Sequence, residues 1–199
     1  MSRKRADVEA EGQGQGRLVA LDGTRGPDVR KSAAALSQEL GSRKAPAGVS
    51  WWDASGIFFE MGLGKKKHRA ASPRTLMLLY AADLAFRLRW EIRPAIAAGQ
   101  TVIAAPYLDA AFAFGRATGL SIDWMTALFR FAPKPDACYR APERKKSEGW
   151  KKDRRDGFGE FFSAVLADGN ASFRPEDLRR EMLAHLESPG RGRKCRRLT

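Results

Sequence analysis

The feature that most constrains the fold is a short apolar run that stops at a glycine turn and leads into an alanine-rich segment. Residues 17 to 21 read RLVAL, and Asp22 and Gly23 follow them. The next segment, VRKSAAALSQEL, places apolar side chains on one helical face, at Val29, Ala33, Leu36 and Leu40. A strand, a turn and a helix are therefore predicted in that order.

Three further apolar runs indicate strands: residues 47–52, 101–107 and 136–140. The longest predicted helix lies between the second and third runs. Ser72 is its expected N-cap, Pro73 its first residue and Gly99 its end, with a bend near Pro94. Later helices are predicted up to Thr118, from Ser121, over residues 156–169 and around Pro175. Alternating strands and helices predict an α/β fold, a three-layer, doubly wound parallel sheet that binds ligands at the strand ends.

Composition limits the classes of site and compartment. The predicted domain covers residues 17–187, between a polar tail (1–16) and a basic tail (188–199) that are both expected to be disordered. No run approaches the roughly 20 apolar residues of a membrane span, and the N-terminus has no apolar signal segment, so a cytoplasmic protein without membrane contact is expected. The only cysteines, Cys138 and Cys195, and the histidines, His68 and His185, predict neither a disulfide framework nor a metal site.

The net charge of +13 is concentrated in three segments: residues 64–69, 140–155 and the C-terminal tail. Such segments suit polyanionic partners, including nucleic acid, but they equally serve solubility. Both interpretations stay open at this point.

Several phrases together resemble the thymidylate kinase family of P-loop nucleoside monophosphate kinases. LVALDG is similar to that family's first strand and phosphate loop, and LMLLYAADLAFRLRW to its long helix. FRFAPKPDACYR resembles the approach to its fourth strand, and GFGEFFSAVLADG its late helix. The resemblance covers residues 17–187 and implies the P-loop NTPase fold.

The polar residues that the resemblance implies are replaced. The family's phosphate loop follows the scheme Gly-x-x-x-x-Gly-Lys-Ser/Thr, in which backbone N–H groups and the lysine hold phosphate and the hydroxyl holds magnesium. Aligned without a gap, Asp28 stands at the second glycine, Val29 at the lysine and Arg30 at the hydroxyl. The other replaced positions are Arg25 for the loop acid, Leu84 for the monophosphate arginine, Ala105 and Pro106 for an Asp-Arg pair, and Gly115 for the base-reading glutamine.

A shifted alignment offers an alternative, in which Lys31 and Ser32 form the lysine–hydroxyl pair of a longer loop. Moving the frame by two residues rotates the apolar positions by about 200° around the helix, which favours the ungapped alignment. Under the shift, Arg30 would still replace the second glycine.

The sequence predicts no catalytic residue and no metal ligand, but it indicates three groups of site residues. The phosphate-loop remnant comprises Asp22, Gly23, Arg25, Gly26, Arg30, Lys31 and Ser32. The cleft candidates are Asp53, Ser55, Asp83 and Tyr107, and the aromatic residues around them (Trp51, Trp52, Phe58 and Phe59) are expected in the core or the cleft wall. A lid-like basic loop over 141–157 contributes Arg144, Lys145, Lys151, Lys152, Arg154 and Arg155.

Three hypotheses follow from these residues. The first is a catalytically inactive pseudokinase that acts as a binding or regulatory module and for which the sequence identifies no certain cofactor. The second is an active dTMP kinase that uses ATP and magnesium through Lys31 and Ser32. The third is a nucleic-acid-associated protein that uses its basic loops and tail. The resemblance also implies a homodimer through the long helix.

Overall fold

A computed structural model describes residues 15–42, 47–60, 71–143, 157–169, 174–187 and 195–198. Its strands form one sheet in the order β2-β3-β1-β4-β5, and every neighbouring pair is parallel. The strands are β1 (Arg17–Asp22), β2 (Ala47–Trp51), β3 (Thr101–Ala105), β4 (Ala137–Arg140) and β5 (Arg196–Arg197). The parallel α/β sheet predicted from the sequence is confirmed.

Two helices, after Ser72 and Ser121, begin where the capping residues predict. Ser72 accepts the Thr75 N–H at 3.1 Å, and Ser121 accepts the Trp124 N–H at 3.4 Å. The helices are α1 (Gly26–Ser42), α2 (Ile57–Glu60), α3 (Pro73–Arg87), α4 (Arg93–Ala97), α5 (Asp109–Ala117), α6 (Ile122–Leu128), α7 (Phe158–Gly169) and α8 (Pro175–Glu187). A π-helical segment, η1 (Leu88–Ile92), joins α3 to α4. The irregularity directly precedes Pro94, which has no N–H to donate and would clash with the carbonyl four residues earlier in a regular helix.

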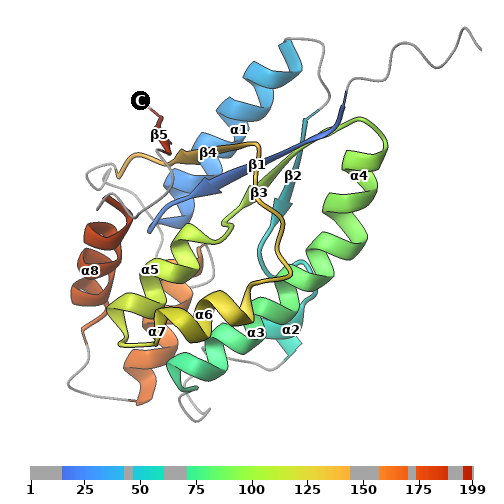
Figure 1. The fold of residues 1–199 in the computed structure, drawn as a ribbon. Helices are drawn as coiled ribbons and strands as arrows, with labels where there is room; N and C mark the ends of the chain where they lie inside the picture. Colours follow the sequence, from blue (N-terminus) through green and yellow to red (C-terminus); the bar gives the residue numbers. More distant parts are fainter. Residues whose placement is uncertain are drawn as a thin grey trace, which may run out of the picture.

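The sheet lies between two layers of helices because side chains alternate along its strands. Val19, Leu21, Ile103 and Ala105 point to α1 and form one apolar cluster with Val29, Ala33 and Leu36. The intervening residues, including Leu18, Ala20, Val102 and Ala104, belong to a second, larger cluster with α3, α5, α7 and α8. Figure 1 shows α1 alone on one side of the strands and these helices on the other. The carboxyl ends of the central strands therefore open between the two layers.

The C-terminal segment differs from the sequence-based expectation. Residues 195–198 include β5, which extends the sheet beside β4, whereas a disordered tail was expected there. A disulfide joins Cys138 to Cys195, with 4.8 Å between their Cα atoms, a single bond that was not anticipated when the sequence excluded a disulfide framework. The sequence separation of 57 residues hides a contact that only the sheet creates.

Candidate functional site

The turn between β1 and α1 is filled by a side chain. Only Gly23, Thr24 and Arg25 separate the strand from the helix, and the Val29 N–H already donates to the Arg25 carbonyl at 3.0 Å. Val29 is buried, and its Cγ2 atom lies 2.8 Å from where a Cβ atom of Gly23 would be. The residue that the ungapped alignment places at the family's lysine is therefore part of the core.

The charged residues of this turn are already engaged or point elsewhere. Arg25 forms an ion pair with Asp28 at 3.5 Å, and the Arg30 guanidinium lies 5.8 Å from the ring centroid of Trp51. Lys31 is exposed and Ser32 is buried, both in the second turn of α1. Both residues therefore lie one turn beyond the N–H groups at the start of α1.

A cavity of about 290 Å³ lies at the carboxyl ends of β1 and β4. Of the predicted phosphate-loop remnant, Asp22, Gly23 and Arg25 line it, whereas Gly26, Arg30, Lys31 and Ser32 do not. The rest of the lining is Thr24, Asp28, Arg140, Ala141, Pro142, Glu143, Leu183, Leu186, Glu187, Cys195 and Arg197. The wall thus combines the first turn, the end of β4, the end of α8 and the C-terminal segment.

Each arginine of the cavity has a carboxylate beside it. Besides the Arg25 pair, Arg140 Nη2 lies 4.0 Å from Asp109 Oδ2, and Arg197 Nη2 lies 3.5 Å from Glu187 Oε1. The lining carries three arginines against Asp22, Asp28, Glu143 and Glu187. Its cationic charge is therefore balanced by the protein's own acids.

Asp22 is the most deeply buried acid of the cavity. Its Oδ1 atom accepts the N–H groups of Tyr107 at 2.8 Å and Ala110 at 3.1 Å. Burial, and then the charge of nearby Asp109, raise the pKa of Asp22 to about 7. Asp22 ties the end of β1 to the start of α5, a role that its place after the apolar run did not reveal.

The cleft candidates fall into two separate groups. Asp83 accepts the N–H groups of Asp53 and Ser55, each at 3.0 Å, and the Ser55 hydroxyl at 2.8 Å. Burial is the main cause that raises the pKa of Asp53, whose Oδ1 caps α2 by accepting the Phe58 N–H at 2.9 Å. Tyr107 joins Asp22 instead, and its hydroxyl donates to the Pro133 carbonyl at 2.7 Å. None of these four residues lines the cavity described above.

Arg87 is a buried residue that sequence reasoning missed. Its Nε donates to Ser50 Oγ at 3.0 Å, Nη1 to the Pro106 carbonyl at 3.0 Å and Nη2 to the Ser50 carbonyl at 2.6 Å. The guanidinium thereby links α3 to the ends of β2 and β3. Its position four residues after Asp83 was the available signal, because residues at that spacing share a helix face.

Aromatic rings fill the space between the sheet and α7. The Trp52 ring centroid lies 5.5 Å from that of Phe58 and 5.3 Å from that of Phe161. Trp52 and Phe58 are thus core residues, whereas Phe59 is 68% exposed. Gly115 contributes to the same packing, since a Cβ atom there would lie 1.9 Å from the Met125 sulfur.

Parts of the predicted site lie outside the described residues. These are Arg144, Lys145, Lys151, Lys152, Arg154 and Arg155 of the lid-like loop, residues 1–14, and residues 188–194 of the basic tail. Within the described ranges, no group of three or more His, Cys, Asp or Glu side chains could hold a metal ion. Over the same ranges, no helix has the length and apolar character needed to cross a bilayer.

Comparison with known proteins identifies thymidylate kinases among the relatives of this chain. No protein-family model matches the chain. It is 28% identical to a thymidylate kinase of Synechococcus sp. over 193 residues, covering 86% of this chain and 90% of the relative. A probable thymidylate kinase of Pyrococcus abyssi is 42% identical over 59 residues, which span only 30% of this chain and 29% of that relative.

A solved structure shows the same fold. The crystal structure of thymidylate kinase from Ehrlichia chaffeensis superposes with a TM-score of 0.50 and 15% identity, covering 64% of this chain and 71% of that one. The sequence matches also point to thymidylate kinases, in agreement with the fold of the parallel sheet. This chain is therefore similar in sequence to thymidylate kinases and has the parallel α/β fold of P-loop NTPases.

Proposed function

We propose that this thymidylate kinase-like chain does not transfer phosphoryl groups and acts as a binding or regulatory module. The observation that carries the proposal is Val29, a buried apolar side chain at the start of α1, at the position where the resemblance implies a phosphate-binding lysine. Phosphoryl transfer depends on positioned charge. An isopropyl group packed against Gly23 can neither donate a hydrogen bond nor neutralise a developing negative charge.

Other positions of the resemblance support the same proposal. Leu84 and Ala105, which replace polar residues of the family, have no exposed surface and contribute to the two apolar clusters. Gly115 stands at the glutamine position, and the Met125 side chain occupies the space beside it. Polar side chains introduced at these points would displace core atoms rather than face a ligand.

The charge of the cavity also disfavours a polyphosphate. Each of its three arginines already lies beside a carboxylate. A phosphate brought to about 4 Å from an unneutralised carboxylate would lose about 4 kcal/mol per pair of unit charges at an effective dielectric constant near 20. Nucleotide binding would therefore have to overcome repulsion from Glu143, which lines the same space and belongs to none of these three pairs.

An assay of dTDP formation from dTMP, ATP and magnesium tests the proposal. We expect no product above the level without protein. The competing hypothesis, an active kinase, assigns ATP and magnesium to Lys31 and Ser32. It is tested by Lys31→Ala, with Lys134→Ala as a control at another exposed lysine. Product that persists in Lys134→Ala and disappears in Lys31→Ala would overturn the pseudokinase proposal.

Thermal denaturation with the same ligands separates binding from turnover. A ligand present at 100 times its dissociation constant stabilises the folded state by about 2.7 kcal/mol. If ATP or dTMP raises the melting temperature and no dTDP is formed, the ligand of a non-catalytic module would be a nucleotide. No change with either ligand would direct the search to a different partner.

A further inference from the structure

The last described segment of the chain is attached to the sheet by a short strand, two polar contacts and one apolar side chain, Leu198, which packs against the cluster beside α1. β5 has only two residues, both exposed, which pair with Tyr139 and Arg140 of β4. The Leu198 N–H donates to the Arg140 carbonyl at 3.0 Å, and Arg197 pairs with Glu187 at the surface. A strand this short gains little from pairing alone, and an exposed ion pair adds little to it.

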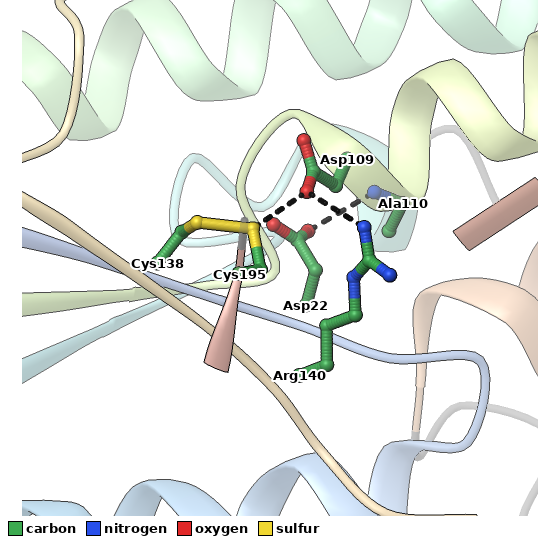
Figure 2. The surroundings of a disulfide bond; sticks show 6 residues. All are labelled: Asp22, Asp109, Ala110, Cys138, Arg140 and Cys195. Atoms are coloured by element: carbon green, nitrogen blue, oxygen red, sulfur yellow. Dashed lines mark hydrogen bonds and ion pairs between the residues drawn. A yellow bond between two sulfur atoms is a disulfide. The ribbon is translucent and has the colours of Figure 1, made fainter. Parts of the chain in front are cut away.

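The covalent attachment is the Cys138–Cys195 disulfide. Cys138 lies in β4, and Cys195 directly precedes β5, so the bond joins the segment to the neighbouring strand at its first residue. Figure 2 shows the two sulfur atoms beside Asp22, Asp109 and Arg140, and Asp109 Oδ2 lies 3.2 Å from Cys195 Sγ. Cys138 and Cys195 are the two cysteines among the 199 residues of this sequence.

The same segment forms one wall of the cavity. Cys195 and Arg197 line it together with Asp22, Thr24 and Glu187 of α8. Both cysteines are partly exposed, and Cys195 borders the cavity itself. A small reductant can therefore approach the bond without prior unfolding of the core, and loss of the segment would open the cavity between β4 and α8.

We propose that Cys138–Cys195 is a redox-responsive site that a dithiol reduces, and that its reduction releases residues 195–198 and opens the cavity. One thiolate of the dithiol attacks a disulfide sulfur, which forms a mixed disulfide and expels the other cysteine as a thiolate. The second thiol of the reductant then displaces the remaining cysteine. The reductant leaves as its own disulfide, and Cys138 and Cys195 each take up one proton. The inference does not depend on whether the protein has kinase activity.

The Leu198 amide is the direct reporter of this change, because its N–H is bonded to the Arg140 carbonyl when the segment is attached. We expect dithiothreitol to raise the number of alkylated cysteines from none to two and to accelerate hydrogen exchange at Leu198 at least about 10-fold. The Asp53 amide, bonded to Asp83 in a different turn, serves as the internal control and should exchange at an unchanged rate.

The variants Cys138→Ser and Cys195→Ser should both show the fast Leu198 exchange, with or without dithiothreitol. Equal Leu198 exchange in the oxidised and reduced protein would overturn the proposal, because the segment would then stay attached without the bond. Acceleration at Asp53 to the same degree would also overturn it, since the disulfide would then support the whole fold. So would a bond that stays oxidised in dithiothreitol while the protein remains folded, because the proposed reductant is a dithiol.

Discussion

Asp22 shows how one buried acid couples folding to pH. Its Oδ1 atom holds the Tyr107 and Ala110 N–H groups, and burial together with Asp109 raises its pKa from 3.8 to about 7. Between these values the folded protein binds more protons at Asp22 than the unfolded chain does. The contribution of Asp22 to the free energy of unfolding therefore falls as the pH rises from about 4 to 7.

Asp22→Asn tests this contribution, because the amide oxygen can still accept both N–H groups while the ionisation is lost. The variant's free energy of unfolding, measured by urea titration, should increase relative to the wild type as the pH rises from about 4 to 7. Asp123→Asn, at an exposed acid on α6, is the matched control for the removal of one carboxylate. A difference between Asp22→Asn and the wild type that does not change with pH would contradict the raised pKa of Asp22.

At the scale of elements, the start of α7 packs directly on the turn after β1. A Cβ atom at Gly159 would lie 2.3 Å from the Thr24 carbonyl oxygen, so the backbones of the two elements are in close contact. Gly41, in α1, is also helical but has no atom within 4 Å of its added Cβ. Alanine at Gly41 therefore changes only the helix propensity, whereas alanine at Gly159 also changes the packing.

Alanine at these two positions should have opposite effects. Gly41→Ala should raise the free energy of unfolding by about 0.4 to 1 kcal/mol, because the unfolded chain loses conformational freedom. Gly159→Ala should lower it by about 1 to 3 kcal/mol, since rigid backbone cannot easily yield to the new methyl group. Chemical denaturation of both variants measures the difference. Equal stabilisation by both would mean that α7 does not contact the turn.

Elements specified by local signals could be predicted, and those specified by distant contacts could not. Ser72 and Ser121 mark helix starts because their hydroxyls cap residues three positions away. The start of α1 at Gly26 was missed, although Pro27 and Asp28 are typical of a first helical turn. β5 could not be found, because two arginines have no strand pattern and their place depends on a disulfide to a residue 57 positions earlier.

The candidate site divides in the same way. The apolar replacements at Val29 and Leu84 follow from the alignment alone, and the structure places both in the core. The cavity wall could not be predicted, since Arg140, Glu187 and Cys195 come from three segments that only folding brings together.

For the whole molecule, the net charge of +13 predicts that salt weakens binding to nucleic acid and strengthens association between two copies of the chain. A nucleic acid would be attracted, and its binding would weaken as salt replaces released counterions. Arg196 and Arg197 are the exposed basic residues of the tail that the structure describes. Two copies of the chain would repel each other, and salt would screen that repulsion.

The effect of salt on self-association tests the expected homodimer through the long helix. Leu78, Phe86 and Trp90 are exposed along α3 and η1, spaced by multiples of four residues, and would supply the apolar contact. In sedimentation velocity, the dimer fraction should rise between about 50 and 500 mM NaCl as the Debye length shortens. Phe86→Glu should abolish the dimer, whereas Ile122→Glu, at an exposed apolar residue of α6, should leave it intact.

The same samples can be titrated with a fluorescent single-stranded DNA. If the basic segments bind phosphates, the observed association constant should fall over the salt range in which the dimer grows. Replacing Arg191, Arg193 and Lys194 of the tail by glutamine should reduce the slope of log K against log salt by about 2, at roughly 0.7 for each phosphate that the tail no longer neutralises. The same replacement at three exposed cations elsewhere, Arg93, Arg116 and Lys134, controls for net charge. A slope reduced equally by both triple variants would assign the attraction to overall charge rather than to the tail.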